Sequence, residues 1–584
     1  MNGIFAYAGK GECKRILLNG IRGMKSKGSE LAGIAILKGE GFATAKLKGT
    51  PAELYEKAES VEGGACIGIC ECADAVRLRA SGVTAPPSVS GDYAAVLDSG
   101  IESYDALKSW CRGKLPVASD EDLLLALLSL VNGDNMLEVM KRIIPSFQRE
   151  LGFAFISSNE EAVYARAGDT PFFVGFTDDG IVLANEAMPV LSISRKFFVI
   201  ENGECVRITR DRAVAFDSRG RRIKKPLRAS PAVQPDRLSA ADGKELFGIP
   251  RSARETLSGI IKSSTIDFSG LHLTRRSLER FKRVIITGCG SYYYASRLAA
   301  YMLEALADLP CTAFTAGELI SSGAYFDSST LLIAVSESGE ERDIFKSISL
   351  AGEFDSKSIL FTLQPYSLCA MAADMTVDWG GSGEGDCPFI SCALSLCLFS
   401  VWAGNRVSSV SELYFSVAAK LAELLPGKLA SAIKSTPELE SAARALLSAE
   451  ELYISGCAAD SAAAMEGARK IRSELGINAV STELSQLLCE SPKCLPYSLF
   501  VVIISSREQL KSALYHLQRL KARGGDIIII TTANLEADIT GFDRVITVTE
   551  SLPVFDSLTC LASLYKTVDL AAEIMKKEEE QQAS

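Results

Sequence analysis

Histidine is nearly absent from this chain of 584 residues, which has only two, both far along the chain from its main cysteine cluster. The 16 cysteines include no C-x2-C pair, the spacing from which zinc sites are commonly built. Cys66, Cys70 and Cys72 lie in a strand-like segment, where a period of two places their thiols on one face. Two interpretations stay open: reduced structural thiols, or a metal or redox site with Cys13 as fourth ligand. We predict structural thiols and no metal.

Basic residues do not outnumber acidic ones, and the net charge of −10 argues against a nucleic-acid partner. The one basic run, residues 219–225, is interpreted as a solvated hairpin. No apolar run of about 18 residues occurs, and no basic segment precedes a long apolar stretch at the start. We therefore expect neither a membrane span nor a signal peptide, and predict a cytoplasmic protein with reduced thiols.

Residues 1–225 alternate short β-rich segments with two helical ones, which predicts an α+β sandwich. The expected strands are 33–37, 93–97, 153–156, 172–176 and 197–200, and the expected helices are 16–25 and 121–132. Ser119 and Asp120 provide N-cap chemistry for the second helix. A segment rich in proline, alanine, serine and arginine follows, so residues 226–275 are predicted to be a linker and a connecting helix.

Beyond residue 280, buried strands alternate with glycine- or serine-containing turns and helices. Strand 284–287 leads into Gly288-Cys-Gly-Ser291, and strand 331–335 leads into Ser336-Glu-Ser-Gly-Glu-Glu341. The plan recurs at 452–475 and 499–523, which predicts two copies of a parallel, doubly wound domain. We place them at 276–425 and 430–560, followed by a C-terminal helix or tail at 561–584 whose charged end frays.

Each strand-to-helix turn exposes backbone N–H groups and a positive helix end, which together can hold an anion. In parallel sheets such ligands bind at the carboxyl ends of the strands. Ser336 and Ser338 add hydroxyl donors there. Helix capping alone explains any single turn of this kind, but two turns in one domain and a second copy of the domain are more specific.

The motifs resemble those of the glucosamine-6-phosphate synthases, the isomerizing glutamine–fructose-6-phosphate aminotransferases. Gly288–Ser291, Ala316-Gly-Glu-Leu319 and the serine turn at 336–340 resemble the first sugar-isomerase (SIS) domain of that family. Met465-Glu-Gly-Ala-Arg-Lys470 and Lys521-Ala-Arg-Gly-Gly525 resemble the second. The resemblance implies an Ntn-hydrolase-like (class II glutamine amidotransferase) sandwich over residues 1–225, followed by two α/β SIS domains.

The resemblance also implies a pocket for fructose 6-phosphate or a similar sugar phosphate. Its lining residues would be Cys289, Gly290, Ser291, Ser336, Glu337, Ser338 and Glu384. Glu341 departs from the family, which has a threonine there. A carboxylate about 4 Å from a phosphate opposes it by roughly 4 kcal/mol per charge pair at an effective dielectric constant near 20. Either Glu341 points away, or the ligand is not the usual phosphate.

The glutaminase of the family uses an amino-terminal cysteine, and this chain has Asn2 at that position. A carboxamide is not a nucleophile, and an initiator methionine is not generally removed before asparagine. Glu71 stands near the place of the family's arginine, and Asp98 near that of its oxyanion-hole asparagine. Only Asp120 matches, as a partner for the substrate amine. The glutaminase is therefore predicted to be inactive.

Isomerase chemistry needs an acid–base pair and a cation. Lys470 matches a family lysine, whereas Ser473 replaces the catalytic glutamate and Glu474 is adjacent. The histidine that the family borrows from a neighbouring subunit falls near Cys489. The Schiff-base lysine has no recognisable counterpart, because Lys576 and Lys577 are poor substitutes. Lys470 and Glu474 are the candidate catalytic residues.

The predicted function is that of a sugar-phosphate-binding protein of amino-sugar metabolism without standard synthase activity. It would regulate or assemble with an active paralogue, or perform an altered isomerase or ammonia-dependent step. The alternative is a divergent but active glutamine–fructose-6-phosphate aminotransferase. A homodimer is expected by resemblance, with no cofactor and with neither nucleic acid nor membrane as partner.

Overall fold

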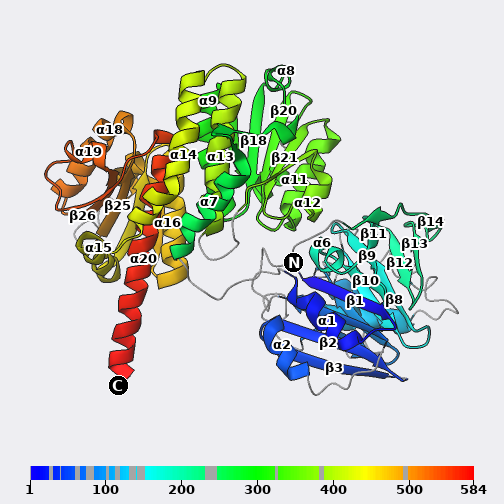
Figure 1. The fold of residues 1–584 in the computed structure, drawn as a ribbon. Coiled ribbons are helices and arrows are strands. Elements are labelled where there is room, and N and C mark those ends of the chain that lie inside the picture. Colours follow the sequence, from blue (N-terminus) through cyan, green and yellow to red (C-terminus); the bar gives the residue numbers. More distant parts are fainter. Residues whose placement is uncertain are drawn as a thin grey trace. The chain divides into compact units, whose positions relative to one another are not determined.

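The chain folds into two compact units: Met1–Pro235 with Tyr366–Leu368, and Asp236–Pro365 with Cys369–Ser584. Figure 1 shows the computed structural model. It describes residues 2–24, 31–39, 41–58, 66–73, 85–99, 101, 104–111, 119–130, 140, 151–230, 246–322, 326–380, 387–490 and 498–583.

The first unit is a sandwich of two antiparallel sheets. One sheet has the order β15 (Arg228–Ala229), β11 (Lys196–Ile200), β9 (Phe172–Phe176), β10 (Gly180–Ala184), β1 (Gly3–Gly9), β4 (Ile67–Ala73), β2 (Leu31–Lys38) and β3 (Gly41–Lys48). The other has the order β14 (Arg222–Ile223), β13 (Ala213–Phe216), β12 (Cys205–Ile208), β8 (Ala162–Arg166), β7 (Phe153–Ser157), β6 (Tyr93–Leu97) and β5 (Ser88–Ser90). The described helices are α1 (Cys13–Arg22), α2 (Pro51–Lys57), α3 (Tyr104–Cys111), α4 (Asp120–Leu130) and α6 (Ala187–Leu191).

Alternating apolar side chains build the core of this sandwich. Ile4, Ala6 and Ala8 of β1 pack with Val96 of β6 and Val163 of β8, so the core lies between the two sheets. Helices α1 and α2 cover one sheet, whereas α4 packs on β5 and β6 of the other sheet and α3 packs on α4. The α+β sandwich is therefore confirmed, together with its five predicted strands and two predicted helices.

The start of α4 shows why the predicted N-cap works. The backbone N–H of Asp122 donates to Ser119 Oγ at 3.1 Å, and Asp122 Oδ2 accepts from the N–H of Ser119 at 3.1 Å. This reciprocal pair satisfies two of the N–H groups at the helix end. The basic run at 219–225 is also a hairpin, as predicted: Phe216 of β13 pairs with Arg222 of β14.

The second unit contains two five-stranded parallel sheets. The first repeat has the order β19 (Cys311–Thr315), β18 (Arg283–Gly288), β20 (Thr330–Val335), β21 (Lys357–Thr362) and β22 (Met375–Asp378). The second repeat has the order β24 (Ala479–Glu483), β23 (Glu451–Gly456), β25 (Ser498–Ile504), β26 (Asp526–Thr532) and β27 (Arg544–Val548). Both place their strands in the same succession, which confirms the predicted duplication.

Helices cover both faces of each sheet in this unit (Figure 1). The first repeat carries α9 (Ser291–Ala307), α10 (Ala316–Ser321), α11 (Arg342–Glu353), α12 (Leu368–Ala372) and α13 (Cys387–Arg406). The second carries α15 (Pro437–Ser448), α16 (Ala459–Leu475), α17 (Leu484–Glu490), α18 (Arg507–Ala522), α19 (Ala533–Glu536) and α20 (Pro553–Ala583). The connecting elements are η5 (Leu246–Gly248), α7 (Ile249–Ile260), β16 (Ile261–Lys262), β17 (Thr265–Ile266), η6 (Ser269–Leu271), α8 (Arg275–Leu278) and α14 (Glu412–Ala432).

One hydrophobic core joins the two repeats, because α9 packs against both α13 and α16. Helix α13 contains a segment, Pro388–Arg406, that is long and apolar enough to cross a membrane, but 94% of that segment is buried inside the unit. It is a core helix. The fraying predicted for the charged end is wrong: α20 stays helical through Ala583, with its last turns exposed.

Candidate functional site

The carboxyl ends of β18 and β20 meet at one edge of the first repeat. Gly288 at the end of β18 lies beside Val335 at the end of β20 in parallel register. Cys289 and Gly290 then turn the chain into α9, and Gly290 adopts φ +55° and ψ −126°, a conformation that favours glycine. The structure thus brings the predicted segments 289–291 and 336–338 to the same edge, on neighbouring strands.

The serine turn after β20 is closed by its own side chains. Ser336 Oγ donates to the carboxylate of Glu341 and accepts from the N–H of Gly339 at 2.7 Å. Ser338 Oγ accepts from the N–H of Glu340 at 3.2 Å. The possibility that Glu341 points away is therefore wrong: its carboxylate lies on the turn, against the buried hydroxyl of Ser336.

Tyr292 connects the two turns of the first repeat. Its hydroxyl donates to Glu337 Oε2 at 2.5 Å. Burial raises the pKa of Tyr292 well above its usual value, and the nearby carboxylate of Glu337 raises it further, so the phenol keeps its proton. The sequence pattern did not single out Tyr292. Its place in the first turn of the helix that follows a glycine turn is the signal that could have done so.

The thiol of Cys369 shows how acidic this edge is. Burial raises the pKa of Cys369, and the carboxylates of Glu341 and Glu340 raise it further. The N–H of Cys369 donates to the carbonyl of Gly339 at 2.8 Å. This hydrogen bond holds the serine turn against α12. The Cys369 thiol therefore keeps its proton.

The predicted pocket residue Glu384 lies outside the described residues.

The second repeat has the same turn with different chemistry. Ala458 adopts φ +51° and ψ −119°, close to the conformation of Gly290. Asp460 stands where the first repeat has Tyr292, and it is only 1% exposed. Its carboxylate accepts from the N–H of Ser505 at 2.8 Å, from Ser505 Oγ at 2.6 Å and from Ser557 Oγ at 2.6 Å. Burial raises the pKa of Asp460, and these hydrogen bonds lower it.

The candidate catalytic pair lies on α16. Lys470 Nζ is 3.4 Å from Glu474 Oε1, one turn further along the helix. The same ammonium lies 5.6 Å from the ring centroid of Tyr565 on α20. The Tyr565 hydroxyl donates to Glu466 at 3.1 Å, and Glu466 is fully buried against Arg469. Lys470 therefore belongs to a polar cluster between α16 and α20, and its catalytic role stays a prediction.

One buried lysine of this region was not predicted. Lys566 of α20 is 4% exposed, and its Nζ lies 2.8 Å from Asp569 Oδ2. The sequence directed attention to Lys576 and Lys577, which the structure places in the exposed end of α20. A lysine inside an apolar helical stretch gives no sequence signal of its own, because only the tertiary packing shows that its side chain is buried.

Asn2 is enclosed at the start of β1. It is 5% exposed, and its Nδ2 donates to Glu71 Oε1 and to the carbonyl of Leu97 at 2.9 Å. Asn185 holds the same segment, because its Nδ2 donates to the Asn2 carbonyl at 2.7 Å and its Oδ1 accepts from the N–H of Ile4 at 2.8 Å. Residue 2 is therefore an integral part of the fold.

Two carboxylates of the predicted glutaminase half accept hydrogen bonds from backbone amides. Asp98 Oδ1 accepts from the N–H of Gly152 at 2.8 Å, and Asp120 Oδ2 accepts from the N–H of Ile101 at 2.9 Å. A Cβ on residue 152 would come within 2.3 Å of the Asp98 carboxylate, so this approach requires glycine. Both acids stabilise local backbone.

The cysteine cluster of β4 is built into its sheet. Cys70 Sγ donates to the carbonyl of Phe5 at 3.4 Å, and Cys72 Sγ donates to that of Gly3 at 3.8 Å. Burial raises the pKa of Cys70 well above its usual value, which keeps the thiol protonated. Within the part of the chain that the structure describes, no group of three or more metal-ligating side chains comes together.

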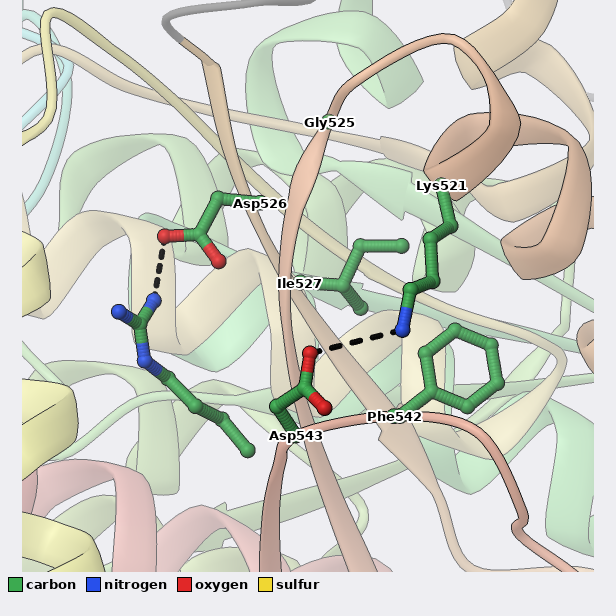
Figure 2. A pocket seen from close by; sticks show the side chains of 7 residues that line it. Lys521, Gly525, Asp526, Ile527, Phe542 and Asp543 are labelled. Atoms are coloured by element: carbon green, nitrogen blue, oxygen red, sulfur yellow. Dashed lines mark hydrogen bonds and ion pairs between the residues drawn. The ribbon is translucent and has the colours of Figure 1, made fainter.

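A small pocket of about 130 Å³ lies at the amino-terminal ends of β26 and β27 (Figure 2). Lys521 and Asp543 face each other across it at 3.5 Å, and Arg544 pairs with Asp526. Phe542 lies 5.5 Å from the Lys521 ammonium. The pocket lies at the edge of the sheet opposite the strand carboxyl ends. Ligands of parallel sheets bind at the carboxyl ends, so this pocket is not the candidate ligand site.

Comparisons with known proteins agree with this architecture. The model of the SIS domain family matches residues 277–384 and 445–567. The glutamine–fructose-6-phosphate aminotransferase of Clostridium acetobutylicum is 24% identical over 99% of this chain and 98% of its own length. That of Caldanaerobacter subterraneus is 24% identical over 94% of this chain and 93% of its own. The chain is thus similar over nearly its whole length to glutamine–fructose-6-phosphate aminotransferases, which supports its membership of their family.

Solved structures support the SIS fold of this family member. The C-terminal domain of glucosamine-fructose-6-phosphate aminotransferase from Francisella tularensis superimposes with a TM-score of 0.53 at 19% identity. The match covers 56% of this chain and 95% of that domain. The two repeats of this aminotransferase relative are therefore SIS domains with parallel sheets.

Proposed function

We propose that this protein binds a sugar phosphate at the first repeat, serves amino-sugar metabolism and has lost glutamine hydrolysis. The observation that carries the loss is Asn2, whose carboxamide is buried and bound to Glu71 and Leu97. A carboxamide nitrogen is not a nucleophile, because its lone pair is delocalised into the neighbouring carbonyl, so Asn2 cannot do what the family's cysteine does. The remaining role is regulation of or assembly with an active paralogue, or an altered isomerase or ammonia-dependent step.

The surroundings of Asn2 support this proposal. An oxyanion is stabilised by hydrogen-bond donors. Glu71 and Asp98 are buried acidic residues, which offer acceptors and would oppose a negative charge. The neighbouring thiols of Cys70 and Cys72 donate to carbonyls of β1 and do not replace the missing sulfur. Because several positions of the glutaminase site differ from the family, loss of the activity explains them better than one isolated substitution does.

Sugar-phosphate binding is supported by the two adjacent turns of the first repeat. Each turn leads into a helix of at least 12 residues, α9 and α11, whose amino-terminal end favours an anion. Ser336 and Ser338 add hydroxyl groups to the turn that precedes α11. We also propose a cytoplasmic protein that forms a homodimer or a hetero-assembly with an active paralogue.

The deciding experiment measures glutamate release from glutamine by the purified protein, beside the Clostridium acetobutylicum relative as positive control. We expect none from this chain. Amino-sugar formation from ammonia and fructose 6-phosphate is measured separately, because it would assign enzymatic activity to the second unit alone. Release of glutamate at a rate comparable to the relative would instead favour the alternative, a divergent active aminotransferase.

Ligand binding is tested by thermal unfolding in the presence of sugar phosphates. A ligand at 100 times its dissociation constant stabilises the folded protein by about 2.7 kcal/mol. Binding alone produces this stabilisation, so it is measurable even if the protein catalyses no reaction. Neutral sugars serve as the control. If no sugar phosphate shifts the unfolding temperature, the binding half of the proposal is wrong.

A further inference from the structure

The carboxylate of Glu341 lies on the serine turn of the first repeat, where an anionic ligand group would bind. Glu341 is the N-cap residue of α11, with extended backbone (φ −71°, ψ 121°), yet its side chain does not cap its own helix. It folds back onto the turn and accepts a hydrogen bond from Ser336. No ion pair of Glu341 occurs among the described residues, so this contact is the main polar interaction of the carboxylate.

This contact uses up the hydroxyl proton that Ser336 would offer a ligand. Ser336 has one hydroxyl proton, which it gives to Glu341, and its oxygen accepts from Gly339. A phosphate oxygen that took the same proton would have to displace the carboxylate of Glu341. It would also meet a like charge if the carboxylate stayed nearby.

The second repeat provides an independent copy of the arrangement. Ser505 follows β25 as Ser336 follows β20, and it too donates its hydroxyl proton to a carboxylate of the chain, that of Asp460. Asp460 arises from a different turn, so the two carboxylates reach equivalent serines by different routes. In both repeats a side chain of the protein occupies the serine turn.

We propose that Glu341 is an internal competitor for the anionic group of the ligand, and thereby sets the specificity of the first repeat. A sugar phosphate binds only by displacing Glu341 from Ser336. The proposal rests on the proposed function, since it assumes that sugar phosphates are the ligands of this turn. It predicts weak binding by the natural protein and tighter binding once the carboxylate is removed.

The test compares the full chain with Glu341→Gln and Glu341→Ala by isothermal titration with fructose 6-phosphate, inorganic phosphate and fructose. Glu353→Gln is the matched control, because it removes one carboxylate from the exposed far end of the same helix. We expect both Glu341 variants to bind the two phosphate compounds at least about tenfold more tightly than the natural protein. Fructose binding and the control should be unchanged.

Two outcomes overturn the proposal, and they differ. If the natural protein binds fructose 6-phosphate as tightly as the Glu341 variants, Glu341 is not a competitor, and the proposed function stands. If none of the proteins binds any phosphate compound, the proposed function fails and the competitor has nothing to exclude. Thermal unfolding without ligand checks that the variants fold. Glu341→Gln keeps the size of the side chain and provides the result if Glu341→Ala does not fold.

Discussion

The two SIS repeats share one strand order and one turn geometry, yet each engages its serine turn differently. In the first, Glu341 reaches Ser336 from within the same turn and stays half-buried. In the second, Asp460 reaches Ser505 from the neighbouring turn and is fixed by Ser557 of α20 as well. A local, half-buried contact can be displaced at low cost. A buried carboxylate with three donors is part of the core.

The largest expected effect comes from removing the buried carboxylate. Asp460→Ala leaves three donors of Ser505 and Ser557 without their acceptor, so we expect a loss of about 3–5 kcal/mol in the unfolding free energy. Urea unfolding measures it, and hydrogen exchange of β25 and α16 localises it. Glu341→Ala is the matched change in the first repeat and should cost less than about 1 kcal/mol. Equal losses would show that the two turns do not differ in this way.

A second, smaller effect concerns pH. Asp556 lies near Asp460, and burial raises its pKa to about 7, while the N–H of Ser551 and the charge of Lys428 lower it and Asp460 and Glu550 raise it. The folded protein thus holds a proton that the unfolded chain releases above pH 3.8. The contribution of Asp556 to stability is therefore fully present at low pH and is lost, by about 1–3 kcal/mol, as pH rises from about 4 to about 7.

The replacement Asp556→Asn tests this dependence. The asparagine variant cannot titrate, so its unfolding free energy should vary less between pH 5 and pH 8 than that of the natural protein. Chemical unfolding at several pH values within the native range measures both slopes. Identical slopes would mean that Asp556 does not carry the buried proton.

The smallest expected effect concerns one position with positive φ, which is glycine in the first turn (Gly290) and alanine in the second (Ala458). Ala458 and Gly290 have nearly the same positive φ, which only glycine adopts without strain. Ala458→Gly should stabilise the protein by about 0.5–1 kcal/mol, and Gly290→Ala should destabilise it by about 1 kcal/mol. Thermal unfolding of both variants measures the pair. Changes in stability of opposite sign would support the equivalence of the two turns, whereas a loss of stability in both variants would contradict it.

Periodicity predicted most of the architecture, because hydrophobic spacing and turn residues act locally. The strands at Tyr93–Leu97 and Phe172–Phe176 have the predicted bounds, and the parallel duplication followed from repeated strand–turn–helix patterns. The end of the chain was mistaken for a frayed segment, since its charges are also compatible with the last turns of α20, an exposed helix.

The candidate site was harder to predict. Residues 289–291 and 336–338 could be named from their motifs. Tyr292, Asp460 and Lys566 could not, because each is defined by a partner or by burial that sequence spacing does not show. For Glu341 the sequence raised the question of direction and could not answer it.

The sequence by itself determined the order of the domains, the duplicated turns and the amide at position 2, because these depend on residue types and on spacing within short segments. Only the tertiary structure decided where the carboxylates point. Glu341 reaches Ser336 through the conformation of its own turn and its rotamer, whereas Asp460 reaches Ser505 through a contact between separate segments, which arises only when the sheet and its helices pack.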